Sequence, residues 1–273
     1  AIIGCEVNMS KNVNKTVLIT GASSGIGEAF AQVFSEQGFD LVLTARRQDR
    51  LESIASNLKL IRPTNIHIIQ ADLSDPMAPK NILDFCTKNE IHIDCLVNNA
   101  GYGNPGKFEE TPWQSHQDFL QVMVTAVTEL TYLFLPGMIK KQYGRIINLA
   151  SLAPYMPAPD MAGLYSPVKI FQIKFSESIH FQYCDHNIHC SAVCPGLTRT
   201  EFHEAANMHE VLKSPNWLWM DSITVARQGV DAVMKGKCLI INGRLNNFFA
   251  ILSKLIPQNL TSSIAKYLTK RSY

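Results

Sequence analysis

Short apolar segments rich in β-branched residues alternate with longer segments of helical period from Lys15 to about Ile241. Apolar runs of this kind, separated by helices, are typical of parallel strands that are joined by crossover helices. The expected strands are Thr16 to Thr20, Asp40 to Thr44, Ile66 to Gln70, Ile93 to Asn98, Gly144 to Leu149, Ile188 to Val193 and Leu239 to Asn242. The expected helices include Gly25 to Gln37, Gln48 to Leu58 and Pro112 to Lys141. The pattern predicts the α/β class, with a doubly wound parallel sheet in three α/β/α layers.

The alternation of short apolar segments and longer helical segments ends at Gly243. No repeat, low-complexity segment or linker interrupts residues 15–243, which we therefore interpret as one domain. Apolar residues between Leu245 and Ile256 fall on one helical stripe, Pro257 ends it, and a second stripe runs from Leu260 to Leu268. We expect residues 244–273 to form an amphipathic helical extension of the same domain.

Composition and charge narrow the function classes. The 273 residues are 46% hydrophobic and 18% charged, which is enough for a sizeable core and excludes a disordered or collagen-like chain. The net charge of +2 gives no overall field that would attract nucleic acid. Every acidic residue lies at or before Asp231, so the last 42 residues carry seven basic residues and no acid.

Seven cysteines, an odd number, occur without any Cys-x-x-Cys pair. This usage disfavours a zinc site or a secreted disulfide framework, and is typical of thiols in a reducing compartment. No uninterrupted apolar run approaches the length of a membrane-spanning helix, and no secretory signal is visible. We interpret residues 1–14 as a leader that is open to disorder, and we expect a cytoplasmic protein without a metal.

A glycine-rich turn follows the first expected strand. It reads Thr20-Gly21-Ala22-Ser23-Ser24-Gly25-Ile26-Gly27, and helical periodicity begins directly after it. Glycine lets the backbone approach a pyrophosphate, and the helix that follows offers free N–H groups and a positive dipole end. The alternative is a glycine-rich turn without a ligand, but the order of strand, turn and helix favours a dinucleotide site.

The spacing Gly-x-x-x-Gly-x-Gly is the first of several motifs that occur in a fixed order. The others are Asn98-Asn99-Ala100-Gly101, Ser151, Tyr165-x-x-x-Lys169 and Pro195-Gly196. Together they resemble the short-chain dehydrogenase/reductase family, over about Lys15 to Thr200. The resemblance implies a Rossmann-type fold and a nicotinamide cofactor.

Cofactor contacts follow from this resemblance by position. It implies that Gly21, Ser23, Ser24, Gly25, Ile26 and Gly27 hold the pyrophosphate, Asn99, Ala100 and Gly101 the ribose side, and Pro195, Gly196, Leu197 and Thr200 the nicotinamide end. It also implies adenine contacts at Asp72 and Leu73. An acid at the start of a helix is a common cap as well, so Asp72 keeps both interpretations.

The end of the second strand bears on the choice between NAD and NADP. An acid there would bind the ribose hydroxyls of NAD, whereas an arginine would pair with the extra phosphate of NADP. The chain has Ala45 in place of the acid, followed by Arg46 and Arg47. We therefore expect NADP(H), with Arg46 on the 2′-phosphate, helped by Arg47 and Ser23. The alternative is that both arginines cap a solvated helix.

Tyr165 and Lys169 are four residues apart and share one face of a helix. A phenol with its usual pKa near 10 is a poor acid at neutral pH, and a nearby ammonium would lower that pKa. The resemblance implies that Tyr165 is the acid/base, that Lys169 also holds the nicotinamide ribose, and that Ser151 binds the substrate oxygen. The expected activity is the interconversion of a carbonyl and a secondary alcohol.

Three departures from the family pattern motivate a second hypothesis. Met123 stands where the family often has an asparagine that completes a proton relay. Ser151 precedes Tyr165 by fourteen residues rather than the usual thirteen, and Pro167 lies in the helix of Tyr165, which must start close to that tyrosine or kink there. These features also fit a dinucleotide-binding sensor or scaffold with weakened catalysis.

Residues 201–222 occupy the position of the family's substrate lid. Trp217, Leu218, Trp219 and Met220 suggest an apolar wall and a hydrophobic carbonyl or alcohol substrate, although the same residues could pack the lid on the core. The helix from Pro112 to Lys141 and the helix after Tyr165 resemble those of the family's homodimer.

The C-terminal extension resembles that of the DltE-like subgroup, where a Gly-x-x-Asn segment, here Gly243 to Asn246, precedes apolar helices. Its basic, amphipathic character in residues 244–273 is compatible with peripheral contact with an anionic membrane. The other interpretation is that its apolar stripe packs on the domain or on a second subunit.

Overall fold

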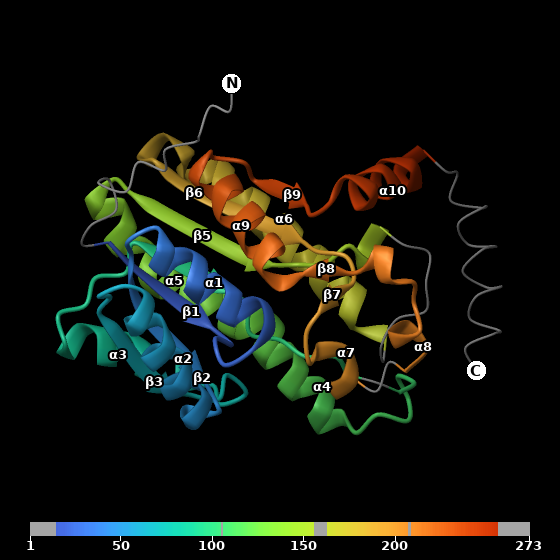
Figure 1. Ribbon diagram of the computed structural model, residues 1–273, viewed down its shortest axis with the longest axis horizontal. Coiled ribbons are helices and arrows are strands. Elements are labelled where there is room, and N and C mark those ends of the chain that lie inside the picture. The colour runs from blue at the N-terminus through green and yellow to red at the C-terminus, as the bar shows by residue number, and fades with distance from the viewer. Residues whose placement is uncertain (1–14, 105, 156–162, 207–208, 256–273) are drawn as a thin grey trace.

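A seven-stranded parallel sheet forms the centre of the molecule. The computed structural model describes residues 15–104, 106–155, 163–206 and 209–255 (Figure 1). The strand order is β3-β2-β1-β4-β5-β6-β9, and each neighbouring pair is parallel. The strands are β1 Thr16–Thr20, β2 Asp40–Ala45, β3 Ile66–Gln70, β4 Cys95–Asn98, β5 Gly144–Leu149, β6 Ile188–Cys194 and β9 Leu239–Ile241. The predicted α/β class and doubly wound sheet are confirmed, and β4 starts two residues later than expected.

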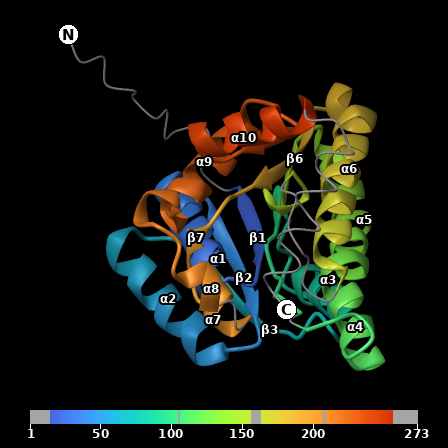
Figure 2. The ribbon, with the colours of Figure 1, turned by 90° about the vertical axis from the view of Figure 1, so that its right-hand side faces the viewer.

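Helices cover both faces of this sheet, as Figure 2 shows, with α1, α2 and α9 on one side and α3, α5 and α6 on the other. The larger helices are α1 Gly25–Glu36, α2 Gln48–Ile61, α3 Ala78–Lys88, α4 Trp113–Leu120, α5 Ala126–Lys141, α6 Tyr165–Tyr183, α9 Ser222–Met234 and α10 Arg244–Leu255. The apolar positions of the helices meet the strands in two large buried clusters, one on each face. The central strands are buried on both sides, which explains their uninterrupted apolar sequences.

The segment predicted as one helix from Pro112 to Lys141 runs through α4, a π-helical turn η2 (Gln121–Thr125) and α5. By length and composition it is the one candidate for a membrane-spanning helix among the described residues. It packs on α3 and β5, and half of its most apolar window is buried. The helix is therefore a core element of the layer that contains α6.

Helix α6 begins at Tyr165, as the position of Pro167 predicts. Pro167 lies in the first turn, where its missing N–H removes no helical hydrogen bond. Val168, Ile173 and Ser176 are buried against the sheet. This start places Tyr165 at the edge of the sheet where the strands end.

A row of buried polar side chains links the sheet to α6. The Asn98 amide donates to Asn148 Oδ1 at 2.9 Å, and the Asn148 amide donates to Ser176 Oγ at 2.8 Å. The Ser176 hydroxyl in turn donates to the main-chain oxygen of Gln172 at 2.7 Å. Buried polar groups of this kind are costly unless paired, so the row fixes how α6 sits on β4 and β5.

The predicted lid contains two short helices, α7 Phe202–Ala205 and α8 His209–Leu212, and a 3₁₀ turn, η6 Asn216–Leu218. Strand β8 (Met220–Asp221) closes this segment and pairs with β7 (Thr198–Arg199). Helix α10 matches the first predicted stripe of the extension and contacts the 3₁₀ turn η3 (Ala153–Tyr155). The leader, the second stripe and part of the loop before Tyr165 lie outside the described residues.

Candidate functional site

A cleft of about 1060 Å³ opens at the carboxyl ends of the strands. It lies where the chain order reverses between β1 and β4, the usual ligand position in an open parallel sheet. Of the predicted site residues, the cleft is lined by Gly21, Ser23, Ser24, Gly25, Ile26, Arg46, Arg47, Asp72, Leu73, Asn99, Ala100, Gly101, Ser151, Tyr165, Lys169, Pro195, Gly196, Leu197 and Thr200. Motifs that are spread over 180 positions of the chain thus converge on one cavity.

The glycine-rich turn connects β1 to the N-terminus of α1. Gly21 has φ +64° and Gly25 has φ +61°, a conformation that side chains disfavour. Ser24 is the N-cap of α1, but its side chain makes no cap hydrogen bond with the helix. The first turn therefore keeps N–H groups and a positive dipole end for an anion, which fits the pyrophosphate of a dinucleotide.

Gly27 does not line the cleft. A Cβ at this position would lie 2.2 Å from the main-chain oxygen of Gly21. The glycine therefore lets the helix pack closely under the turn.

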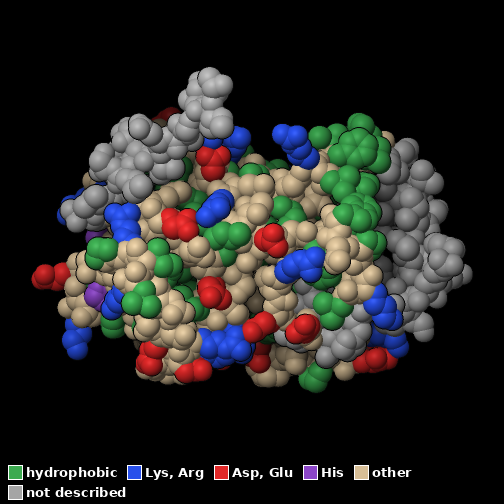
Figure 3. All heavy atoms as spheres, viewed as in Figure 1, with side chains coloured by type: hydrophobic (Ala, Val, Ile, Leu, Met, Phe, Trp, Pro, Cys, Tyr) green, Lys and Arg blue, Asp and Glu red, His purple; other side chains and the backbone are tan. Residues whose placement is uncertain are grey.

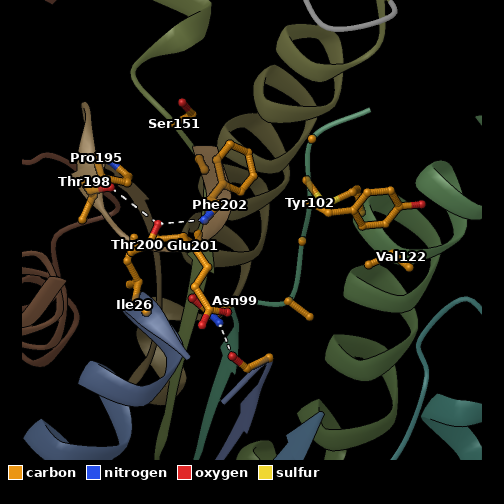
Figure 4. A pocket seen from close by; sticks show the side chains of 18 of the residues that line it. Ile26, Asn99, Tyr102, Val122, Ser151, Pro195, Thr198, Thr200, Glu201 and Phe202 are labelled. Carbon is orange, nitrogen blue, oxygen red and sulfur yellow. Dashed lines mark hydrogen bonds between the residues drawn. The ribbon is translucent and has the colours of Figure 1, made fainter. Parts of the chain in front are cut away.

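Asn99 supports the same turn. Its side-chain amide donates to the main-chain oxygens of Thr20, at 2.9 Å, and Gly21, at 3.1 Å. Figure 4 shows Asn99 on the floor of the pocket beside this contact. The side chain expected at the ribose thus fixes the turn that would hold the pyrophosphate.

The two adjacent arginines differ in their contacts. Arg47 donates to the hydroxyls of Ser24, at 2.8 Å, and Ser23, at 3.2 Å. It also pairs with Glu201 of the lid at 3.0 Å, and Arg50 pairs with the other oxygen of the same carboxylate. Both pairs lower the pKa of Glu201, with the hydrogen bond from Arg50 as the larger cause. Arg47, rather than Arg46, therefore forms a cluster with the two serines.

Asp72 lines the cleft but does not cap a helix, because α3 starts at Ala78 with Met77 as its N-cap. Its Oδ1 accepts hydrogen bonds from the main-chain N–H and the hydroxyl of Ser74, at 3.0 and 2.9 Å. This is a local turn contact made by one carboxylate oxygen, and the residue still lines the cleft.

Tyr165, Lys169 and Ser151 all line the cleft. The Lys169 Nζ lies 5.5 Å from the ring centre of Tyr165. Ser151 follows β5, and its Oγ accepts the Ala153 N–H at 3.1 Å. Lys169 is only 5% exposed, and its burial lowers the pKa of its ammonium to about 7.

The Lys169 ammonium is held by oxygens. It donates to the main-chain oxygen of Leu149 at 2.6 Å and to Gln172 Oε1 at 3.0 Å. Gln172 in turn donates to the main-chain oxygen of Met123 at 2.9 Å. The Met123 side chain is fully buried and fills the space beside Gly101, so its thioether is a packing group.

The apolar wall differs from the one expected. Trp217 is 67% exposed, and Trp219 donates its indole N–H to the Ser214 oxygen. Among the described lid residues, Phe202 and Leu218 supply apolar lining, and the ring of Phe202 lies 5.9 Å from that of Tyr165. In Figure 4, Tyr102 lies beside Val122, across the pocket from Phe202.

Helix α10 also contributes to the wall, which the sequence did not predict. Asn246 and Phe249 line the cleft, and Ala250 is buried. A residue of the expected apolar stripe, Phe248, instead points outward and is 59% exposed. The extension is therefore part of the pocket as well as a covering element.

The comparison with known families agrees with this geometry. The profile of the family described as short chain dehydrogenase matches residues 15–211. The oxidoreductase UcpA of Salmonella typhimurium is 32% identical over 197 residues, which cover 72% of this chain and 74% of that protein. The chain belongs to the short-chain dehydrogenase family.

Solved structures show the same fold. A short-chain dehydrogenase from Sphingobium yanoikuyae, in complex with NADPH, is 27% identical with a TM-score of 0.77, covering 89% of this chain and 97% of that one. A short-chain dehydrogenase/reductase from Burkholderia phymatum, in complex with NAD, has a TM-score of 0.78 over 88% and 92%. Its 22% identity shows the fold alone. The protein is a short-chain oxidoreductase of alcohols or carbonyls that uses a nicotinamide dinucleotide.

The buried Lys169 predicts a specific pH dependence of stability. The pKa is about 7 in the folded chain, against 10.5 for an unperturbed lysine, so between these values the unfolded chain binds more protons. The free energy of unfolding must then rise with pH over this window. In urea titrations without cofactor from pH 7 to 10, wild type should gain a few kcal/mol relative to Lys169→Met. Equal pH dependence in both proteins would show that the folded state leaves this lysine unperturbed.

Proposed function

We propose that the protein is an NADP(H)-dependent oxidoreductase that interconverts a hydrophobic carbonyl compound and its secondary alcohol. One observation carries the proposal: the Lys169 Nζ lies 5.5 Å from the ring centre of Tyr165, in the cleft that also contains the glycine-rich turn. A phenol beside a cation is suited to proton transfer near neutral pH.

In this proposal each side chain has one task. The dinucleotide, when bound, supplies or accepts the hydride. Tyr165 donates a proton to the carbonyl oxygen in reduction and removes it in oxidation. Lys169 stabilises the phenolate and holds the nicotinamide ribose, and Ser151 orients the substrate oxygen. Phe202 packs on Tyr165 and keeps water from the reacting oxygen.

Tyr165→Phe tests the proton donor directly. The variant keeps the ring and its packing on Phe202 but lacks the hydroxyl. We expect kcat for ketone reduction to fall by about 10²- to 10⁴-fold, because general acid catalysis typically contributes that much, while NADPH affinity stays within about twofold. Turnover is measured by NADPH absorbance, and affinity by fluorescence titration.

Tyr183→Phe is the matched control, since it makes the same chemical change at the far end of α6. It should leave kcat unchanged. If wild type binds NADPH but turns over no member of a broad ketone panel, the protein is a sensor or scaffold, as Met123 and Pro167 suggested. A Tyr165→Phe variant with full activity would remove the tyrosine from the mechanism.

The preference for NADP(H) rests on the cluster formed by Arg47, Ser23 and Ser24. A guanidinium and two hydroxyls converge there, and no acid occupies the end of β2. The carboxylate of Glu201 already occupies this cluster, which supports its suitability for an anion. We propose that Arg47 grips the 2′-phosphate, with Arg46 at the rim of the cleft.

Arg47→Ala should abolish discrimination between the two cofactors. Loss of a charge-assisted contact should weaken NADPH binding by about 10- to 100-fold and leave NADH binding nearly unchanged. Arg50→Ala is the control, because Arg50 pairs with Glu201 but makes no bond to either serine. Discrimination lost instead in Arg46→Ala would assign the phosphate to Arg46 and contradict the role of Arg47.

A hydrophobic substrate is supported by the apolar side chains near Tyr165. Phe202 and Leu218 from the lid and Phe249 from α10 line this end of the cleft. Such a wall favours ketones with alkyl or aryl substituents on both sides of the carbonyl.

Phe249→Ala and Phe248→Ala form a matched pair of variants. Phe249 lines the cleft, whereas Phe248 is 59% exposed on the outer side of the same helix. For a bulky aryl ketone, kcat/KM should fall about 10- to 100-fold in Phe249→Ala, the value of one buried aromatic side chain, and remain unchanged in Phe248→Ala. Equal effects of the two changes would show that α10 does not contact the substrate.

We also propose a cytoplasmic homodimer that pairs α5 and α6 of two copies. The support is a set of exposed apolar side chains on these helices: Tyr132, Ile170, Phe171 and Phe181. Sedimentation velocity distinguishes this dimer from a monomer.

The outer face of α10 exposes Phe248, Ile251 and Leu255. Hydrophobic side chains gather at the upper right of the molecule in Figure 3. Co-sedimentation with anionic vesicles tests whether residues 244–273 also contact a membrane.

A further inference from the structure

Gln172 links helix α6 to the π-helical turn η2 beneath Lys169. It lies on α6, three residues after Lys169, and is 1% exposed. Its Oε1 accepts the Lys169 ammonium at 3.0 Å, and its Nε2 donates to the Met123 main-chain oxygen at 2.9 Å. Both ends of this buried amide therefore have a partner among the described residues, which fixes its position.

The orientation of this amide follows from its partners. Lysine offers only N–H donors, and a main-chain oxygen offers only an acceptor. The reverse orientation would set the amide nitrogen against the ammonium and the amide oxygen against the Met123 oxygen. The oxygen of Gln172 therefore belongs on the Lys169 side.

The Met123 oxygen belongs to the π-helical turn η2. Such turns depart from the regular hydrogen-bond ladder of an α-helix and often occur at functional sites. Here the turn lies between α4 and α5, and it brings a main-chain oxygen within reach of a side chain on α6. The contact uses the backbone, so it is independent of the thioether at this position.

We propose that Gln172 is a positioning residue for Lys169. Its side chain holds the ammonium group in a fixed position relative to the η2 backbone. Together with the Leu149 oxygen it occupies two of the three N–H groups of Lys169. The third N–H is then left to act in the cleft. This inference rests on the proposed role of Lys169 beside Tyr165.

The contact also matters for the charge of Lys169. Burial favours the neutral amine, and the oxygens of Leu149 and Gln172 favour the ammonium. Other titratable groups that face Lys169 are Cys194 of β6 and Tyr165 of α6. Burial raises the pKa of the Cys194 thiol to about 12, so that thiol is neutral at physiological pH. The two oxygens accept hydrogen bonds from the ammonium and in this way favour the positive charge.

Two substitutions should move the titration of Lys169 in opposite directions. Gln172→Met keeps the volume but removes the acceptor, so the Lys169 pKa should fall by about one unit. Gln172→Glu places a carboxylate beside the ammonium and should raise this pKa by about one unit. The measurement is NMR of ¹³Cε-labelled lysine in the cofactor-free protein, with the Lys169 signal assigned through Lys169→Arg.

Kinetics supply a second readout. Lys169 acts as a cation, so kcat should be lost as pH rises through its pKa. The basic limb of the kcat profile for ketone reduction should move to lower pH in Gln172→Met and to higher pH in Gln172→Glu. KM for the ketone should stay within about twofold, because Gln172 does not line the cleft.

Ser176→Ala is the matched control for a merely structural effect. Ser176 is fully buried one turn further along the same face of α6. It bonds to Asn148 and to the main-chain oxygen of Gln172, but not to Lys169. This variant should lose stability without shifting the Lys169 titration. The proposal is overturned if both Gln172 variants leave the titration unchanged, shift it in one direction, or match Ser176→Ala. Because NMR needs no cofactor, absence of turnover in wild type would refute the proposed function and leave this test intact.

Discussion

All strands of the main sheet run in one direction, and this constraint places their carboxyl ends along a single edge. Strands buried on both faces cannot expose polar side chains along their length, so chemistry can develop only where they end. The glycine-rich turn, Asn99, Ser151 and the Pro195-Gly196 segment all follow strands at this edge. Helix α6 supplies the remaining groups because it starts at the same edge and runs back along the sheet.

The buried polar groups beneath the site connect this edge to the core. Asn98, Asn148 and Ser176 form a row that ends at the main chain of Gln172, and the side chain of Gln172 reaches Lys169 and the η2 turn. Each of these side chains makes at least one hydrogen bond within the row. The row gives α6 one preferred position on the sheet, and that position determines where Tyr165 and Lys169 stand.

Much of this arrangement could be predicted from the sequence, because strands such as Thr16–Thr20 are apolar runs with polar residues at both ends. Pro167 limited α6 to two possibilities, a start close to Tyr165 or a kink, and the structure has the start at Tyr165. Periodicity could not decide which of two adjacent arginines turns to Ser23, or that Glu201, 154 positions further along, would meet Arg47. It also could not separate the inward Phe249 from the outward Phe248, because the stripe around them is broad. The contact between Gln172 and Met123 joins two helices, and depends on a π turn for which the sequence has no clear signal.

The ion pair between Glu201 and Arg47 means that the lid carries its own anion into the cofactor cleft. If the 2′-phosphate binds at Arg47, as proposed, it would replace this carboxylate rather than fill a site of uncompensated positive charge. The electrostatic gain on binding would then be only the difference between the two anions. The return of the carboxylate would assist departure of the phosphate, so this exchange would moderate cofactor affinity and favour release.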